Sequence, residues 1–312
     1  MIKINQSILI TGVAGFIGRY VARYFYQQGW SIIGIDSASP ENAGIANLTN
    51  YYSLRLPDPK LANILQITQP QLCIHCAGRA SVGLSVTDPQ ADFYSNTIVT
   101  FEILNSLRLN SPKCKFIFLS SAAVYGNPQT LPIKENDLIS PISPYGFHKW
   151  QSEQICLEFA QIYQIPTTSV RIFSAYGAGL RRQVLWDMCY QAINQKTLNL
   201  QGTGTESRDF IHVADIAQAL EIIAEKAPMT GEVYNLACGE EVAISDLAEL
   251  ILKSLNYQIK PQFNGIVGAG NPLNWQGDIT KIQQLGFQPK ISLEQGVKSF
   301  VNWCRAELLE VQ

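Results

Sequence analysis

The chain has 312 residues, of which 46% are hydrophobic and 15% charged, and its formal net charge at pH 7 is −2. This composition argues against a disordered chain, and the near-neutral charge gives no field that would attract nucleic acid or a membrane surface. No run of about 20 apolar residues is present, so we expect no membrane span and neither a membrane nor a nucleic-acid partner.

The first half of the chain alternates short apolar runs, typical of strands, with longer patterns typical of helices. The predicted strands are Ser7–Thr11, Ser31–Asp36, Leu72–Cys76, Lys115–Ser120 and Thr167–Phe173. The predicted helices are Phe16–Gln28, Phe93–Leu109 and Pro144–Tyr163. Strands that alternate with helices indicate a parallel sheet covered on both faces, so we predict a doubly wound α/β fold.

After about residue 174 the pattern becomes less regular. Helices are predicted at Val184–Asn194, Val213–Glu225 and Ile244–Leu255, and a short strand at Leu198–Leu200. The apolar run Val233–Leu236 is expected to return to the main sheet, so the C-terminal part is interleaved with the first. We predict one domain at 1–174, with a returning segment near 205–240, and a smaller α/β part mainly at 175–312.

A glycine-rich turn follows the first predicted strand. Gly12, Gly15 and Gly18 stand where the first helix begins, and such a turn lets the backbone and the helix N-terminus bind a pyrophosphate. Asp36 ends the next strand, where its carboxylate can bind both ribose hydroxyls and would repel a 2′-phosphate. The pattern predicts a Rossmann-type dinucleotide site that favours NAD over NADP.

Tyr145 and Lys149 are spaced so that they share one face of a predicted helix. Ser143 supplies its N-cap and Pro144 its first position. A free tyrosine has a pKa near about 10, but a neighbouring ammonium favours the phenolate and lowers that pKa. The pair indicates acid/base chemistry, although the spacing alone also occurs by chance on helix surfaces.

Further motifs follow in a consistent order along nearly the whole chain. They are His75-Cys76-Ala77-Gly78, Asn96, Ser120-Ser121-Ala122-Ala123-Val124-Tyr125-Gly126, Arg171-Ile172-Phe173, Gly202-Thr203-Gly204, Arg208-Asp209-Phe210-Ile211-His212-Val213 and Val233-Tyr234-Asn235-Leu236. With these motifs, the GxxGxxG turn and the YxxxK pair, the chain resembles the extended short-chain dehydrogenase/reductase family, specifically its nucleotide-sugar epimerases and dehydratases. The resemblance implies NAD as cofactor, a nucleotide-diphosphate sugar as substrate, an NAD-binding first domain and a substrate-binding second one.

The resemblance also implies roles for the matching residues. Tyr145 would be the acid/base, Lys149 would modulate its pKa and hold the nicotinamide ribose, and Ser121 and Asn96 would complete the catalytic group. The cofactor would contact Gly12, Gly15, Phe16, Ile17, Gly18, Asp36, Ala77, Gly78, Arg79, Asn96, Ser120, Tyr145, Lys149 and Phe173. The substrate would contact Ser121, Ala122, Tyr145, Ser174 and Arg208. The guanidinium of Arg208 suits a diphosphate, the alternative being a structural pair with Asp209 or another carboxylate.

Two departures from the family pattern bear on the reaction and on how the substrate diphosphate is bound. Ala122 and Ala123 stand where the 4,6-dehydratases have Asp and Glu, and a methyl group cannot transfer a proton, which argues against a dehydratase. The sugar-acid decarboxylases also carry a Glu in this segment. The segment 267–272 lacks the arginine usual near the second phosphate; Arg181 and Arg182 either compensate or form a solvated pair.

Three functions stay open. The leading hypothesis is an NAD-dependent epimerase that acts at C4 of a nucleotide-diphosphate sugar through a transient 4-keto intermediate. The second is an NAD(P)H-dependent 4-reductase of a 4-keto-6-deoxy nucleotide sugar. The third is a non-catalytic dinucleotide-binding protein, against which the presence of Ser121, Tyr145 and Lys149 counts.

The predicted helices at 93–109 and 144–163 carry wide apolar faces. The resemblance implies a homodimer in which two such helices from each subunit form a four-helix interface; alternatively, these faces only cover the sheet. Seven cysteines without a regular framework fit a reducing cytoplasm, and we expect no signal peptide. Cys73 and Cys76 lack the second pair that a zinc ribbon needs, so we expect buried thiols and no metal.

Overall fold

The computed structural model describes residues 6–45, 47–266, 268, 270 and 272–309, and its centre is a seven-stranded sheet. The strand order is β11-β6-β5-β4-β1-β2-β3, and all neighbours run parallel. The strands are β1 (Ser7–Thr11), β2 (Ser31–Asp36), β3 (Asn50–Ser53), β4 (Leu72–His75), β5 (Lys115–Ser121), β6 (Thr167–Ile172) and β11 (Thr230–Leu236). The order reverses between β1 and β4, which confirms the doubly wound, Rossmann-type α/β fold.

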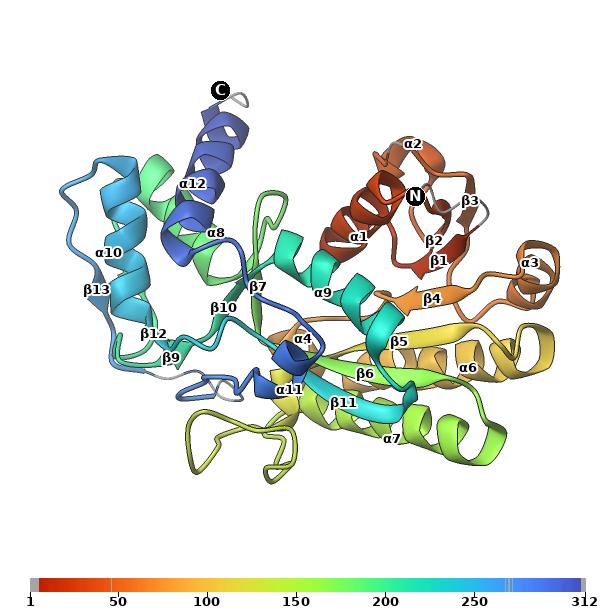
Figure 1. Cartoon of the computed structure of the whole chain (residues 1–312). Coiled ribbons are helices and arrows are strands. Elements are labelled where there is room, and N and C mark those ends of the chain that lie inside the picture. The colour runs from red at the N-terminus through yellow and green to blue at the C-terminus, as the bar shows by residue number, and fades with distance from the viewer. Residues whose placement is uncertain (1–5, 46, 267, 269, 271, 310–312) are drawn as a thin grey trace.

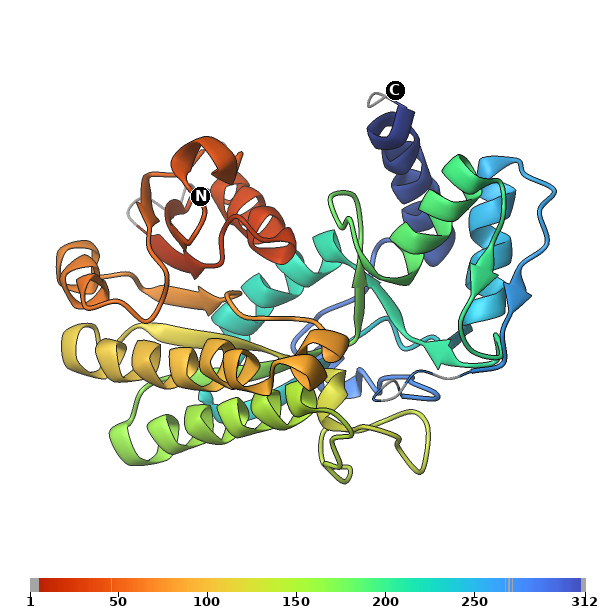
Figure 2. The ribbon, with the colours of Figure 1, turned by 180° about the vertical axis from the view of Figure 1, so that it is seen from behind.

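Helices cover both faces of this sheet (Figure 1, Figure 2). Along β1, Ile8 and Ile10 face one layer and Leu9 the other, because successive side chains alternate across a strand. The first layer holds α1 (Phe16–Gln27) and α9 (Val213–Lys226); the second holds α3 (Lys60–Thr68), α6 (Val99–Asn110) and α7 (Pro144–Tyr163). Burial on both faces explains why these strands are nearly continuous apolar runs.

Smaller elements complete the first part of the chain. They are α2 (Pro40–Ala43), α4 (Val82–Thr87), α5 (Pro89–Phe93), the π-helix η1 (Tyr94–Ile98) and the 3₁₀-helix η2 (Ala122–Val124). The helix predicted at 93–109 therefore begins earlier, with α5, and passes through a π-turn into α6. The strand predicted at 72–76 is β4. The bounds of β3 were not predicted, because this short, half-exposed edge strand has no apolar run that would reveal it.

The C-terminal part has its own apolar core. Its elements are β7 (Ser174–Tyr176), α8 (Gln183–Tyr190), the π-helix η3 (Gln191–Gln195), β8 (Asn199–Leu200), β9 (Ser207–Arg208), β10 (Phe210–His212), β12 (Val242–Ala243), α10 (Ile244–Leu255), β13 (Gln262–Phe263), α11 (Thr280–Gln284) and α12 (Leu293–Leu309). The sequence interpretation missed α12, although its buried Val297, Phe300, Val301 and Cys304 follow helical spacing.

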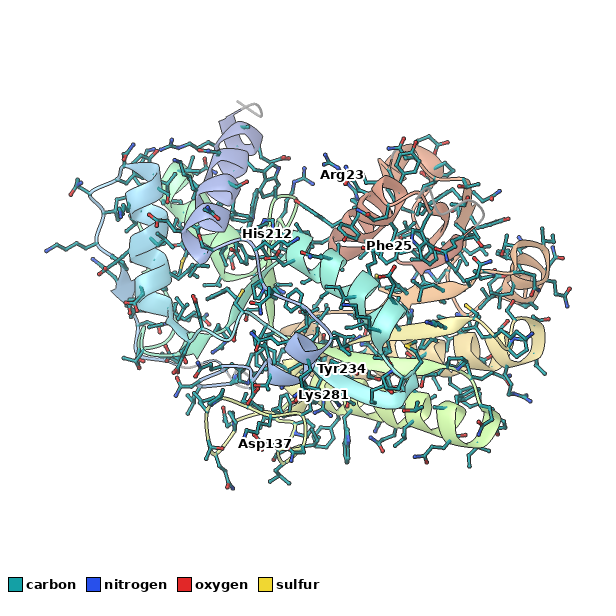
Figure 3. The ribbon with its side chains drawn as sticks, viewed as in Figure 1. Arg23, Phe25, Asp137, His212, Tyr234 and Lys281 are labelled. Carbon is teal, nitrogen blue, oxygen red and sulfur yellow. The ribbon has the colours of Figure 1, made fainter. Side chains whose placement is uncertain are left out.

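The returning strand β11 of the main sheet packs against α11 near the C-terminal part. Lys281 lies over the ring of Tyr234 with its Nζ 4.7 Å from the ring centre (Figure 3), and it donates a hydrogen bond to the carbonyl of Val233 at 2.7 Å. No helix in the described part of the chain is both long and apolar enough to cross a membrane.

Candidate active site

The glycine turn after β1 leaves no room for a side chain at Gly12 or Gly18. Gly12 has a φ of +67°, and a Cβ there would lie 2.6 Å from the backbone nitrogen of Ala77. A Cβ on Gly18 would overlap the carbonyl oxygen of Gly12. Gly15 is the N-cap of α1, and no side chain caps the first N–H groups of that helix. Turn and helix end thus form a backbone cradle for an anion.

Asp36 stands beside this cradle at the end of β2. Its Oδ2 accepts a hydrogen bond from the N–H of Ala14 at 2.9 Å, and its Oδ1 accepts one from the N–H of Ala38 at 3.0 Å. The carboxylate is therefore fixed within the loop that forms the cradle. This is the position that the sequence predicted for a ribose-binding carboxylate.

The segment after β4 forms the next wall. Gly78 has a φ of +146°, and a Cβ there would lie 2.6 Å from Oδ1 of Asn96. The side chain of Asn96 donates to the carbonyl of Arg79 at 3.2 Å, whereas Nη1 of Arg79 pairs with Asp88 at 3.1 Å. Asn96 lies within the π-helix η1, an irregularity that often marks functional sites. Its buried Oδ1 accepts no hydrogen bond from the described residues.

Ser121, Tyr145 and Lys149 meet where β5 ends and α7 begins. Ser143 caps α7 as predicted, with its Oγ accepting from the N–H of Gly146 at 3.2 Å. The hydroxyl of Ser121 lies close enough to the phenol of Tyr145 to lower its pKa. Nζ of Lys149 lies 5.9 Å from the centre of the Tyr145 ring. Residues from distant parts of the chain therefore form one cluster.

The pKa of Tyr145 is shifted in the direction opposite to the one expected from the sequence. Burial raises this pKa to about 12, and the neighbouring hydroxyl of Ser121 only partly offsets the effect. Burial also lowers the pKa of Lys149 to about 8. The net shift of the Tyr145 pKa is thus upward and not downward as expected, because desolvation outweighs the groups that lower this pKa, Ser121 and Arg182.

His75 and the cysteines near it lie within or at the edge of the core. Nδ1 of His75 is 2.6 Å from Oγ1 of Thr11, and burial together with the charge of Lys149 lowers the pKa of His75 to about 3. The imidazole is therefore neutral. Cys73 is fully buried as predicted, and Cys76 is partly buried.

On the predicted substrate side, Ser174 begins β7 and Phe173 packs edge-on against Trp275. The guanidinium of Arg208 lies 5.4 Å from the centre of the Trp275 ring, and burial lowers its pKa to about 10. Among the described residues no carboxylate pairs with Arg208. Asp209 instead accepts hydrogen bonds from the backbone N–H groups of Cys238, Gly239 and Gly277, so the alternative Arg208–Asp209 pair is wrong.

The two arginines after Gly179 do not behave as a pair. Arg181 forms an exposed ion pair with Glu307 at 2.5 Å, whereas the charge of Arg182 contributes to lowering the pKa of Tyr145. In the segment without an arginine, Val267, Ala269 and Asn271 lie outside the described residues.

Sequence reasoning missed a buried ion pair beneath the cluster. Arg171 on β6 pairs with Glu153 on α7 at 2.7 Å, and Glu153 also accepts a hydrogen bond from Ser120 at 2.5 Å. The hydroxyl of Tyr125 accepts from Arg171 at 2.8 Å. Glu153 lies one helical turn after Lys149, and this spacing is the signal that could have revealed it.

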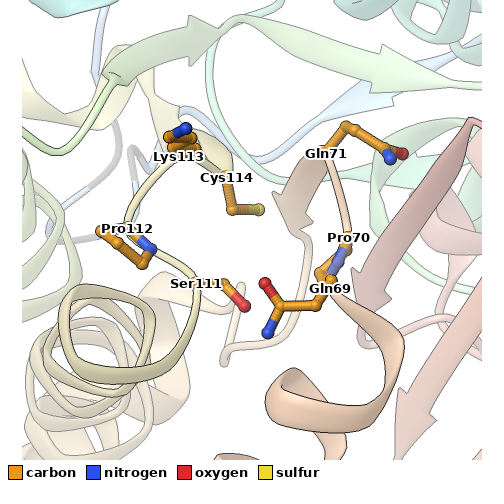
Figure 4. A pocket seen from close by; sticks show the side chains of 7 residues that line it. All are labelled: Gln69, Pro70, Gln71, Ser111, Pro112, Lys113 and Cys114. Carbon is orange, nitrogen blue, oxygen red and sulfur yellow. The ribbon is translucent and has the colours of Figure 1, made fainter.

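A separate cavity of about 350 Å³ lies far from this cluster (Figure 4). It is lined by Gln69, Pro70, Gln71, Ser111, Pro112, Lys113 and Cys114. These loops lead into β4 and β5, so the cavity is at the amino edge of the sheet, whereas the glycine turn and Ser121 are at the carboxyl edge. It contains no residue of the predicted site.

Comparisons with known proteins agree with this arrangement. The sequence model of the NAD dependent epimerase/dehydratase family matches residues 8–237. The chain belongs to this family. The resemblance inferred from the motifs is therefore confirmed, and NAD is the cofactor of the family, consistent with the glycine cradle and Asp36.

Individual members of the family match over nearly their whole length. A putative UDP-glucose 4-epimerase of Methanocaldococcus jannaschii is 28% identical over 96% of this chain and 98% of its own. The UDP-glucose 4-epimerase of Thermotoga maritima, solved with UDP-glucose, is 30% identical with a TM-score of 0.89, covering 97% of this chain and 100% of its own. The UDP-glucuronic acid 4-epimerase of Bacillus cereus, solved with UDP-glucuronic acid and NAD, is 26% identical with a TM-score of 0.88, covering 97% and 100%.

Proposed function

We propose that this protein is an NAD-dependent epimerase that inverts C4 of a nucleotide-diphosphate sugar, with UDP-sugars as the first candidates. The observation that carries the proposal is the cluster of Ser121, Tyr145 and Lys149 beside the glycine cradle. The family members that match over nearly the full chain, and that bear UDP-sugar 4-epimerase names, support the choice of substrate.

In the proposed mechanism, Tyr145 as phenolate removes the proton of the C4 hydroxyl while the hydroxyl of Ser121 binds the same oxygen. NAD, held by the glycine turn and Asp36, would supply the acceptor and donor of the C4 hydride, and its positive ring would favour the phenolate of Tyr145. The 4-keto sugar turns over between the two transfers, and Tyr145 then returns its proton to the oxygen. The charge of Lys149 favours the phenolate, and Asn96 completes the hydrogen-bonded network.

The remaining assignments are part of the same proposal. Gly12, Gly15, Phe16, Ile17 and Gly18 would hold the pyrophosphate; Asp36 the adenosine ribose; and Ala77, Gly78, Arg79, Asn96, Ser120, Tyr145, Lys149 and Phe173 the rest of the cofactor. Ser121, Ala122, Tyr145, Ser174 and Arg208 would contact the substrate. Residues 1–174, with the returning segment, would then bind NAD, and residues 175–312 would mainly bind the sugar nucleotide.

The buried methyl groups of Ala122 and Ala123 support epimerisation over dehydration. An acid/base pair that eliminates water needs groups that exchange protons, and neither alanine has one. Ser121, Tyr145 and Lys149 would then serve only the oxidation and reduction at C4.

The test is turnover of UDP-glucose, UDP-N-acetylglucosamine and UDP-glucuronic acid with no added reductant, followed by NMR of the anomeric protons. We expect one of these sugars to interconvert with its C4 epimer, and Tyr145→Phe to stop the reaction. Conversion of 4-keto sugars with stoichiometric consumption of NAD(P)H, without epimerisation, would instead establish the reductase. Cofactor binding without either reaction would establish the non-catalytic protein.

We also propose a homodimer through α6 and α7. Both helices expose large apolar side chains on their outer surface, with Phe101 38% and Ile162 68% exposed. Light scattering should then give twice the mass of the 34.6 kDa chain.

All seven cysteines are without a disulfide, which supports the expected cytoplasmic location.

A further inference from the structure

The guanidinium of Arg208 is only partly hydrogen-bonded within the protein. Its Nη1 donates to the carbonyl oxygens of Ser207 at 2.7 Å and Leu273 at 3.2 Å, but its Nε and Nη2 donate to no group in the described part of the chain. The carboxylate of Glu206 is occupied elsewhere, because it accepts from two backbone N–H groups of its own loop, each at 2.9 Å. Two of the three guanidinium nitrogens are therefore available to an anion.

The indole of Trp275 is the surface on which this guanidinium lies. The guanidinium carbon of Arg208 is 5.4 Å from the centre of the Trp275 ring, which is within the range of a cation–π contact. The N–H donors of a guanidinium lie in its plane and form a rigid fork. A ring that holds this plane therefore sets the directions in which the free Nε and Nη2 can donate.

Trp275 is itself held on several sides. Its Nε1 donates to the carbonyl oxygen of Gly126 at 3.0 Å, and its backbone N–H donates to the carbonyl oxygen of Ser207 at 3.2 Å. The ring of Phe173 meets the indole edge-on, with the ring centres 6.1 Å apart. Only 8% of Trp275 is exposed. The indole thus has little freedom to rotate or to move away from Arg208.

Gly126 belongs to the same short turn as Ser121. Oγ of Ser121 accepts a hydrogen bond from the N–H of Ala123 at 3.2 Å, and the carbonyl oxygen of Ala123 accepts one from the N–H of Gly126 at 3.4 Å. The hydrogen bond from Nε1 therefore fastens the indole to the turn at the end of β5. Trp275 in this way connects Arg208, on β9 of the C-terminal part, with the segment that carries the catalytic serine.

We propose that Trp275 is a positioning residue of Arg208: its indole, fastened to the turn that begins at Ser121, holds the guanidinium in the orientation that binds the substrate diphosphate. The proposal rests on the proposed function, because it takes Arg208 as the diphosphate contact. Trp275 acts through Arg208, so its contribution to diphosphate binding disappears when Arg208 is removed. The hydrogen bond to Gly126 also keeps the diphosphate at a fixed place relative to the reacting end of the sugar.

The direct test is a double-mutant cycle on UDP affinity, measured by calorimetry with the full-length protein in the presence of NAD. UDP carries the diphosphate and lacks the sugar, so a contact of Trp275 with the sugar does not enter the measurement. We expect Arg208→Ala to weaken binding about tenfold or more, and Trp275→Leu, which removes the aromatic face, to weaken it about three- to tenfold. In the Arg208→Ala background, Trp275→Leu should change the affinity less than about twofold.

The comparison of the two backgrounds decides the matter. An equal loss from Trp275→Leu with and without Arg208 would show that Trp275 acts independently of it and overturns the proposal, as does an unchanged affinity in Trp275→Leu. If Trp275→Leu does not fold, Trp275→Phe takes its place in the cycle. The phenyl ring retains a contact with Phe173 but loses the hydrogen bond to Gly126, so a smaller loss with the same dependence on Arg208 is expected.

Arg181 and Trp303 are the matched control pair. The guanidinium carbon of Arg181 lies 5.8 Å from the centre of the Trp303 ring, but Arg181 is exposed and paired with Glu307. Arg181→Ala and Trp303→Leu should each change UDP affinity less than about twofold. A loss in Trp303→Leu equal to that in Trp275→Leu would be a general effect of removing a tryptophan beside an arginine, and overturns the proposal.

Turnover should show the same dependence. KM for the sugar nucleotide should rise in Trp275→Leu, and adding this substitution to Arg208→Ala should raise it no further. If the wild-type protein binds UDP but epimerises no sugar, the proposed function fails, whereas the UDP cycle still decides the role of Trp275. The cycle is run with dTDP or GDP if either binds more tightly; a wild-type protein that binds none of the three overturns the proposal.

Discussion

Lys149 donates a hydrogen bond from its Nζ to the carbonyl oxygen of Leu119 at 2.9 Å, and the same nitrogen lies 5.9 Å from the centre of the Tyr145 ring. The end of β5 thus positions the ammonium near the tyrosine. Burial opposes the ionisation of Tyr145. A positive charge held near its hydroxyl, such as the ammonium of Lys149, would favour the phenolate again.

Replacing Lys149 by Met retains the length of the side chain and removes its charge. We expect turnover to fall by about two orders of magnitude, because the phenolate of Tyr145 becomes harder to form. The pH profile should also lose the limb that belongs to the ammonium, whose pKa is about 8 in the wild-type protein. Turnover is measured with the sugar on which the wild type acts, and turnover of Lys149→Met close to wild type would contradict the role.

Asp36→Ala tests the carboxylate beside the glycine turn. We expect the affinity for NAD to fall by roughly 10- to 100-fold, because hydrogen bonds to a charged group are lost. Discrimination against NADP should fall as well, since the charge that repels a 2′-phosphate is gone. Calorimetric titration with both cofactors checks this, and an unchanged ratio of the two affinities would show that Asp36 does not contact the ribose.

Arg208→Ala tests the proposed contact with the diphosphate. We expect KM for the sugar nucleotide to rise about tenfold or more while kcat changes little, because a charge-assisted contact made before and during the reaction is lost. Arg181→Ala is the matched control, since Arg181 is exposed and already paired with Glu307. Equal effects of the two substitutions on KM would argue against a specific role of Arg208.

The parts of this site that could be predicted from the sequence are local ones. Thr11 to Gly18 form a strand, a turn and a helix start in succession, so the cradle follows from neighbouring residues. Tyr145 and Lys149 share a helix face by spacing alone. The main strands could also be predicted from local sequence, because their burial on both faces makes them apolar throughout.

What could not be predicted depends on packing between distant segments. The net shift of the pKa of Tyr145 is set by how deeply the residue is buried, which no spacing reveals. The contact of Asp92 with His148 joins residues 56 positions apart and exists because α5 packs on α7. Asp209 likewise looked like a partner for Arg208, but its carboxylate binds three backbone N–H groups from two other loops.

The neutral, buried imidazole of His75 makes stability depend on pH. Its pKa is about 3 in the folded protein, because of burial first and the charge of Lys149 second. In an unfolded chain a histidine has a pKa near about 6.5. Between these values the unfolded state binds more protons than the folded one, so stability rises with pH through this window and is lost on acidification.

His75→Asn should remove this contribution. An asparagine amide can take the place of Nδ1 and preserve the contact with Thr11, but it does not titrate in this range. Urea unfolding from about pH 4 to 7 should show wild-type stability falling more steeply on acidification than that of the variant, so that the difference between the two proteins depends on pH. Because other groups titrate equally in both proteins, the difference isolates His75. A difference that stays constant over this range would mean that His75 is not held neutral in the folded protein.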